Sequence, residues 1–345
     1  MGNDYNLSPK LFAIIEQLPD CCNTYLTHSE TALSLSTRLE YARDLLAFFN
    51  YLISYNPHFA IMKLKDITIR DLEKISPNDI TIFVNHYTKN ENTAARKRAS
   101  LSAFFKFLCA NRSLTYNPVD GSMRVKIHEN ERVIYLDDEE MKFFLDAVRN
   151  GTGLTDSQLK YHERYRTRDL AMMGLFLSTG IRVSELKNID IQDVELESCR
   201  MYVIRKGGKT NMVAFNDSVK SLIEDYLEER REKFRYLEVT DPLFATLKGD
   251  RLTSRAIENL VKKYAIAALS NRGNKAYKIS PHKLRSSFAM NFYRASNNNI
   301  LLTKDVMGHE SIVTTNKYAK ATKQEVYDAR NLVNPLKDDN KKKET

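Results

Sequence analysis

Two segments of the 345-residue sequence place arginines beside groups that could assist chemistry on a phosphate. Arg182 follows a predicted helix end at residues 179–180, and Glu185 comes three residues later. His282 and Arg285, near a predicted helix start, are three residues apart and therefore share one helix face. Two arginines near one phosphate make bidentate, charge-assisted hydrogen bonds and stabilise a pentavalent transition state. A salt bridge is the ordinary role of a lone arginine, so the combination of the two segments carries the argument.

Three further segments supply a lysine, a histidine and a tyrosine. Lys206 lies at the tip of a predicted hairpin, His309 follows a short predicted helix, and Tyr318 comes nine residues after His309. A lysine ammonium on its flexible stem acts as an acid when its site lowers its pKa. A phenol, with an ordinary pKa of about 10, is a poor nucleophile until cations and a proton acceptor activate it. Lys209 is close enough to Lys206 to be a rival acid, and Tyr327 is the nearest competitor of Tyr318.

Motifs for cofactors and metals are missing from the sequence. It contains no GxGxxG and no GxxxxGK[ST], so a nucleotide cofactor has no support. His128, His162 and His309 each precede a glutamate, but none is followed by the second histidine of HExxH. Clustered carboxylates for two-metal nuclease chemistry do not stand out either. We therefore expect neither a cofactor nor a metal, and chemistry on phosphates would rest on cations and a side-chain nucleophile.

The order and spacing of these segments resemble the active site of the tyrosine recombinases, the phage-integrase superfamily. The matching motifs are TGIRVSEL (179–186), the lysine-bearing hairpin RKGGK (205–209), PHKLR (281–285), MGHES (307–311) and the tyrosine that follows. Within the family, the hairpin, the PHKLR box and an extra loop before residue 166 most resemble the Xer branch, especially the single-recombinase Xer proteins of streptococci and lactococci. Ser286 stands where Xer proteins usually have histidine, but His282 and Arg285 of that box are present.

The resemblance implies a role for each of these residues. Arg182 and Arg285 would hold the scissile phosphate, with Glu185 as a supporting residue that orients the site. His282 would assist proton transfer, and His309 would donate to a non-bridging oxygen. Lys206 would be the general acid that protonates the departing 5′ oxygen, and Tyr318 would be the nucleophile.

The resemblance also implies the course of the reaction. Tyr318 would form a 3′-phosphotyrosyl link, and strands would be exchanged through a Holliday junction between double-stranded DNA sites. The covalent link conserves the energy of the phosphodiester, so neither ATP nor a metal would be required. A homotetramer would assemble on two DNA sites, and residues 326–336 resemble the C-terminal helix that packs into a neighbouring protomer. A DNA translocase or accessory factor would be a possible activating partner.

Composition agrees with a nucleic-acid partner and excludes other classes. The net charge is +9, with most of the excess beyond residue 120, which favours polyanionic partners. The longest apolar run in a helical pattern, residues 170–177, is far too short to span a bilayer, and no signal peptide is visible. The four scattered cysteines fit reduced thiols. We expect a cytoplasmic protein with no membrane partner.

The elements that must position these residues are mostly helices. Apolar spacing predicts helices from residue 35 to the stop at 56–57, from 77 to about 88 and from about 92 to 112. Further helices are expected over 137–148, 166–178, 218–236, 254–269, 283–295 and 302–307, with a surface loop over 150–162. The hairpin of residues 200–205 and 210–215 is the one clear β pattern.

Two of the predicted helices carry basic residues on the face opposite their apolar side. Three basic residues stand in a row in the helix near residue 92, and no acid follows before Asp120. Arg255 would approach DNA at the start of its own helix, by analogy with the family. We expect these two helices to grip DNA from opposite sides through Arg96, Lys97, Arg98 and Lys106 in the first and Arg255, Lys262 and Lys263 in the second.

The predicted fold class is mainly α with a small β-sheet: a two-domain DNA clamp. It would consist of a helical SAM-like core-binding domain (1–120), a linker (121–134), an α+β tyrosine-recombinase catalytic domain (135–331) and a C-terminal tail (332–345). The predicted activity is metal- and ATP-independent site-specific recombination, of the kind that resolves chromosome dimers. Alternatives are the integrase of a mobile element, a non-catalytic architectural DNA-binding protein on the same fold, a type IB topoisomerase and a metal nuclease.

Overall fold

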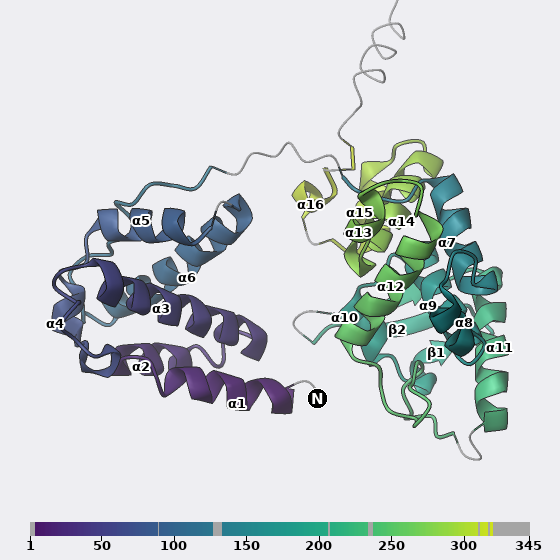
Figure 1. Ribbon diagram of the computed structural model, residues 1–345, viewed down its shortest axis with the longest axis horizontal. Coiled ribbons are helices and arrows are strands. Elements are labelled where there is room, and N and C mark those ends of the chain that lie inside the picture. Colours follow the sequence, from purple (N-terminus) through teal and green to yellow (C-terminus); the bar gives the residue numbers. More distant parts are fainter. Residues whose placement is uncertain are drawn as a thin grey trace, which may run out of the picture. The chain divides into compact units, whose positions relative to one another are not determined.

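The computed structural model describes residues 4–88, 90–126, 133–205, 208–233, 237–309, 311–316 and 318–319. The chain divides into two compact units, Met1–Glu131 and Arg132–Thr345, and each is described by itself (Figure 1). Lys206, Tyr327 and the predicted C-terminal helix at 326–336 lie outside the described residues. The division falls inside the linker expected at 121–134; the domain limits themselves stay predictions.

The first unit is built from helices that pack around one long helix, α3. Buried aromatic side chains, among them Phe48, Phe49, Phe83, Phe104 and Phe105, fill its core. Helix α3 contacts α1, α2, α5 and α6. The elements are α1 (Asp4–Ile15), α2 (Asp20–His28), α3 (Leu35–Tyr55), η1 (Leu64–Asp66), α4 (Ile69–Leu72), α5 (Pro77–Tyr87) and α6 (Glu91–Ala110).

Helices α3 and α5 start at side-chain caps, at the positions that the sequence predicts. Ser34 accepts a hydrogen bond from the Thr37 N–H at the start of α3. Ser76 and Asp79 form a capping box at the start of α5, which explains the sharp beginning of that helix. Helices α1 and α2 precede Leu35, in a part of the chain for which the apolar spacing predicts no helix.

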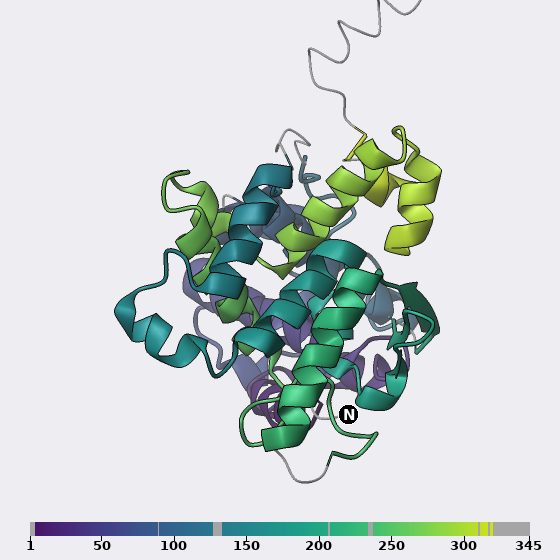
Figure 2. The same cartoon turned by 90° about the vertical axis from the view of Figure 1, so that its right-hand side faces the viewer.

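The second unit contains the segments with the chemistry-bearing residues. Helix α9 lies at its centre and packs against α7, α11 and α14; Figure 2 shows α9 beside α11. The helices are α7 (Asp138–Asn150), α8 (Asp156–His162), α9 (Arg166–Thr179), α10 (Val183–Asn188), η2 (Ile191–Asp193), α11 (Asp217–Lys233), α12 (Ser254–Ala268), α13 (Lys275–Lys278), α14 (Pro281–Ala295), α15 (Ile300–Met307) and α16 (Ile312–Asn316).

An antiparallel sheet lies against this helical core. Within the described residues its strands are β1 (Val194–Glu195), β2 (Arg200–Ile204) and β3 (Thr210–Ala214), in the order β1-β2-β3. The β2–β3 register pairs Arg200 with Ala214 and Ile204 with Thr210. Met201 and Val203 face the core while Tyr202 and Ile204 are exposed, the alternation expected of a half-buried strand. The predicted hairpin is confirmed as β2 and β3, and β1 pairs with β2 as a further strand.

The loop expected over residues 150–162 is wrong, because helix α8 occupies its second half. Thr155 and Gln158 form a capping box that starts the helix. The buried His162 ring then bonds the Val148 carbonyl at 2.8 Å and fixes α8 onto the end of α7. A seven-residue helix held by one cap and one histidine leaves little apolar periodicity to find in the sequence.

Candidate active site

Arg182 and Glu185 lie together at the start of α10, immediately after α9. Gly180 ends α9 in the left-handed conformation (φ 61°), which favours glycine. A Cβ at this position would also lie 2.5 Å from the Phe288 ring, so a larger residue would clash. The Arg182 N–H donates to Glu185 Oε2 (3.0 Å), and its Nη1 donates to Oε1 (2.6 Å). The Glu185 side chain is 4% exposed and the Arg182 side chain 40%. The carboxylate therefore orients an arginine that remains open to a ligand.

Arg285 joins three of the expected segments. It projects from the start of the second turn of α14, and its two Nη atoms donate to the carbonyls of Gly180 and Met307. The first carbonyl ends α9 and the second ends α15, so residues more than a hundred positions apart meet at one guanidinium. Burial, followed by the charge of Arg182, lowers the pKa of Arg285 to about 10. The arginine is still charged at neutral pH, in a site with an excess of positive charge.

His309 and Tyr318 lie side by side at the end of the described chain. Their rings are nearly parallel (15°), with centroids 6.5 Å apart. His309 Nδ1 is 2.9 Å from the Thr315 hydroxyl, and both residues are buried. The Tyr318 ring, 2% exposed, packs in a small cluster with Ala289 and Met307. The charge of a Tyr318 phenolate would raise the pKa of Arg285, which places the phenol within electrostatic range of the arginine site.

His282 and Ser286 occupy successive turns of α14. His282 is exposed on the first turn, and its carbonyl accepts a hydrogen bond from the buried Ser286 hydroxyl (3.1 Å). The departure from the Xer pattern at residue 286 is thus accommodated by a bond within the helix. Lys209, the rival acid, is exposed on the hairpin.

Sequence reasoning missed two residues of this site, Arg205 and Thr315. The Arg205 side chain, 17% exposed, places Nε 3.6 Å from Glu185 Oε1. Its guanidinium fills the space above Gly308, where a Cβ would coincide with it. Arg205 belongs to the RKGGK motif, but its contact with Gly308 depends on the fold. Thr315 lies in the segment before the tyrosine, where only its contact with His309 distinguishes it.

The predicted basic face of α6 is partly wrong, because consecutive residues point in different directions around a helix. Lys97, 12% exposed, turns inward: its Nζ bonds the buried Asp44 at 3.0 Å and lies over the Tyr87 ring. Arg96 also binds Asp44 but is 40% exposed. Arg98 turns toward the segment that follows α6, where its Nη2 donates to the Val119 carbonyl at 2.7 Å.

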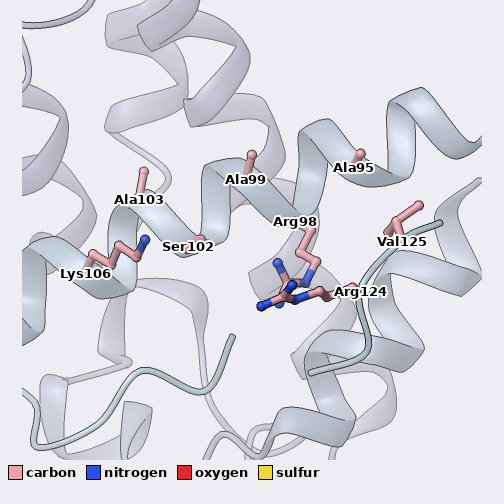
Figure 3. A pocket seen from close by; sticks show the side chains of 8 residues that line it. All are labelled: Ala95, Arg98, Ala99, Ser102, Ala103, Lys106, Arg124 and Val125. Atoms are coloured by element: carbon pink, nitrogen blue, oxygen red, sulfur yellow. The ribbon is translucent and has the colours of Figure 1, made fainter. Parts of the chain in front are cut away.

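A groove of about 490 Å³ runs along α6 and brings a different set of cations together. Its cationic lining residues are Arg98, Lys106 and Arg124, of which Arg124 was not predicted. Figure 3 shows the Arg98 and Arg124 side chains pointing toward each other, with Lys106 on a later turn. The other α6 residues that line the groove have small side chains, such as Ala99.

On α12, two of the three basic residues predicted to contact DNA are exposed. Arg255, 81% exposed, and Lys262 lie seven residues apart on one exposed face. Lys263 is only 21% exposed; its Nζ lies 3.9 Å from the centre of the Tyr264 ring and 3.8 Å from the buried Asp169. Burial lowers the pKa of Lys263 despite that carboxylate. Its outward placement is therefore wrong, because the buried Asp169 of α9 lies within reach of Lys263 and of the neighbouring Tyr264 hydroxyl.

Comparison with protein families identifies both units. A model of the phage integrase family matches residues 135–325, and a model of the phage integrase N-terminal SAM-like domain matches residues 24–112. Among curated relatives, tyrosine recombinase XerC of Caldanaerobacter subterraneus subsp. tengcongensis is 28% identical, covering 96% of this chain and 92% of the relative. Tyrosine recombinase XerS of Lactococcus lactis subsp. cremoris is 26% identical, covering 85% and 88%.

Solved structures show the same fold. XerH bound to its difH substrate before cleavage has a TM-score of 0.62 at 23% identity, covering 86% of this chain and 79% of that one. The Tn1549 transposon integrase with transposon right end DNA has a TM-score of 0.63 at 16% identity, covering 91% and 99%. The family model spans more than half of the sequence and includes every segment of the site described above. The chain therefore belongs to the phage integrase family of tyrosine recombinases.

Proposed function

We propose that this chain is a site-specific DNA recombinase in which Tyr318 cuts one strand and holds it as a 3′-phosphotyrosyl link. The observation that carries the proposal is the Arg285 guanidinium, which binds the carbonyls of Gly180 and Met307. Through these bonds it gathers Arg182 and Glu185, the first turn of α14 and the segment leading to His309 and Tyr318. Such a site has cations, a carboxylate that orients one of them and a nucleophile.

Each group has a chemical task in this reaction. Arg182 and Arg285 bind the non-bridging oxygens and stabilise the charge that grows as phosphorus becomes pentacoordinate. The Tyr318 Oη–P bond forms while the P–O5′ bond breaks; His282 assists removal of the phenol proton, and His309 donates to a non-bridging oxygen. Lys206, with Lys209 as its rival, gives a proton to O5′. Because the Tyr318 ring is nearly fully buried, attack on a duplex requires it to leave its apolar cluster.

The link between phosphate and tyrosine has about the energy of the bond it replaces. A 5′ hydroxyl of a partner strand can attack it and rejoin the DNA, so we propose that neither ATP nor a metal ion takes part. Within the described residues, no three His, Cys, Asp or Glu side chains cluster as metal ligands. The described helices also include none that is long and apolar enough to cross a membrane.

The proposed substrate is a pair of double-stranded DNA sites held by four copies of the chain. As its role we propose chromosome-dimer resolution in the cytoplasm, with a DNA translocase or accessory factor as a further partner; the tyrosine recombinases XerC and XerS among the relatives support the Xer assignment on which this role rests. The fold shared with a transposon integrase supports the second candidate, integration or excision of a mobile element by the same chemistry. The proposed duplex contacts are Arg98, Lys106, Arg255 and Lys262, with partly exposed Arg96 beside them; Lys97 and Lys263 have structural partners instead.

Covalent capture from a random DNA library tests this proposal and identifies the target sequence at the same time. Duplexes with a random segment beside a nick are incubated with the chain in EDTA, and DNA that partitions with protein after detergent and phenol is sequenced. We expect an enriched sequence motif and a protease-sensitive adduct, both absent with Tyr318→Phe. Specific binding without an adduct would favour an architectural protein or one that needs an activator, and adducts without sequence preference would favour a topoisomerase.

A further inference from the structure

Arg205 closes the base of the hairpin turn through its backbone. Its N–H donates to the Lys209 carbonyl at 2.9 Å, and its own carbonyl accepts from the Gly208 N–H at 3.0 Å. Lys206 is the next residue in the sequence. The place at which the Arg205 side chain is held therefore sets the position of the base of the hairpin, where Lys209 also lies.

The side chain of Arg205 reaches two other segments of the site. Its Nε lies 3.6 Å from Glu185 Oε1, the same oxygen that accepts from Arg182. Its guanidinium lies against the backbone of Gly308, which ends α15 with φ 58° and precedes His309. One side chain thus connects the end of β2 with the start of α10 and the end of α15.

Arg205 is incompletely satisfied in the fold, although it pairs with Glu185. Among the described residues Nε has no hydrogen-bond partner, although it is buried. The guanidinium also lies within electrostatic range of Arg285, whose pKa it helps to lower. A buried cation beside like charges costs free energy of folding, and Glu185 already has a shorter contact with Arg182. A benefit during the reaction would explain why an arginine with an unsatisfied Nε lies beside these cations.

We propose that Arg205 is a positioning residue that holds the base of the hairpin against Glu185 and Gly308, so that a hairpin lysine delivers its proton to the leaving 5′ oxygen. This inference rests on the proposed function. Arg205 acts on one step, departure of the oxygen, and the guanidinium groups of Arg182 and Arg285 hold the phosphate.

A substrate that needs no acid isolates that step. In the natural strand the P–O5′ bond breaks and the alkoxide must take a proton. When sulfur replaces O5′, the P–S bond breaks instead and releases a thiolate, which is stable without a proton because a thiol is far more acidic than an alcohol. A variant whose only defect is proton delivery therefore recovers on the sulfur substrate.

The experiment measures the rate of covalent-complex formation on matched suicide duplexes, one with oxygen and one with sulfur at the scissile 5′ position. We expect Arg205→Ala to be about tenfold to a hundredfold slower than wild type on oxygen and within about threefold on sulfur. Arg205→Lys, which keeps the charge but loses the planar fork, should show the same pattern more weakly. The sulfur-to-oxygen rate ratio of one preparation does not depend on its folded fraction, so partial misfolding cannot imitate the result.

Two reference variants complete the test. Arg182→Ala should be slow on both substrates, because phosphate binding is needed in either case. Arg200→Ala removes an exposed arginine at the other end of β2 and should match wild type. If Arg205→Ala has the same sulfur-to-oxygen rate ratio as wild type, with or without a lower rate, the inference is overturned. The proposed recombinase function is not affected by that result. Failure of wild type to form any adduct overturns the proposed function and the inference together.

Discussion

Among the individual residues, His309 depends most clearly on one neighbour. Its Nδ1 lies 2.9 Å from the buried Thr315 hydroxyl, which can either donate to this nitrogen or accept from it. If the hydroxyl donates, the ring proton of neutral His309 is on Nε2. The Nε2–H group can then donate a hydrogen bond to a phosphate oxygen. Thr315 would then select the tautomer that the proposed role needs.

Substitution of Thr315 tests this dependence. We expect Thr315→Val, which keeps the shape and removes the hydroxyl, to slow covalent-complex formation about tenfold through loss of an oriented hydrogen bond. Thr315→Ser keeps the hydroxyl and should stay within about twofold to threefold of wild type. DNA affinity, measured by mobility shift, should change in neither variant. Equal rates for Thr315→Val and wild type would show that His309 needs no such partner.

The sequence was informative at this scale where a motif is local. Glu185 is three residues from Arg182, and Arg285 is three from His282, so spacing alone places each pair on one turn. Arg205 is different, because its partner Gly308 is about a hundred residues away and is recognised only when α15 meets the hairpin. No periodicity in the sequence encodes that meeting.

At the level of elements, α6 separates two kinds of basic residue that look alike in the sequence. Lys97 is paired with Asp44, a carboxylate that is 1% exposed, whereas Lys106 is exposed and lines the groove with Arg98 and Arg124. A buried carboxylate needs its cations, because an unpaired charge in the interior is strongly destabilising. A groove lysine contributes to stability very little and is available to phosphate.

Lys97→Ala and Lys106→Ala should therefore have opposite effects. We expect Lys97→Ala to lower the melting temperature by several degrees, because Asp44 loses one of its cations. Lys106→Ala should leave the melting temperature unchanged and reduce the salt dependence of DNA binding by about one phosphate contact. Calorimetry and binding titrations from 50 to about 200 mM salt measure the two quantities. A Lys97→Ala variant with an unchanged melting temperature and weak DNA binding would instead support a DNA contact by Lys97, as the sequence predicts.

The boundaries of α3, α5 and α9 were predictable from caps, and the directions of single side chains were not. Ser34, Ser76 and Gly180 mark the ends of α3, α5 and α9 in the sequence as they do in the structure. The periodicity of α12 predicts an outward position for Lys263, but its ammonium lies beside the buried Asp169 of α9. A carboxylate from another helix decides the outcome, and single-helix periodicity cannot include it.

At the scale of the molecule, each unit buries its own ionisable tyrosines within a separate apolar core. In the first unit Tyr25, 4% exposed, packs against Phe104 and Phe107, and burial raises the pKa of its phenol to about 12. In the second unit burial also raises the pKa of Tyr264, whose hydroxyl donates to Asp169 at 2.8 Å. Each core therefore contains a buried phenol whose ionisation is unfavourable in the folded state.

This burial predicts a loss of stability in alkaline solution. The phenol of Tyr25 ionises at about pH 10 in the unfolded chain and at about pH 12 in the folded one. Its contribution to stability is complete below pH 10 and is lost as the pH rises through that window, because the unfolded chain releases its proton first. We expect Tyr25→Phe to reduce the fall in melting temperature between pH 9 and about pH 11 relative to wild type. Tyr161→Phe, which changes a tyrosine that is 51% exposed, should leave the fall unchanged. An identical fall in all three proteins would mean that the Tyr25 phenol ionises as easily in the folded core as in water.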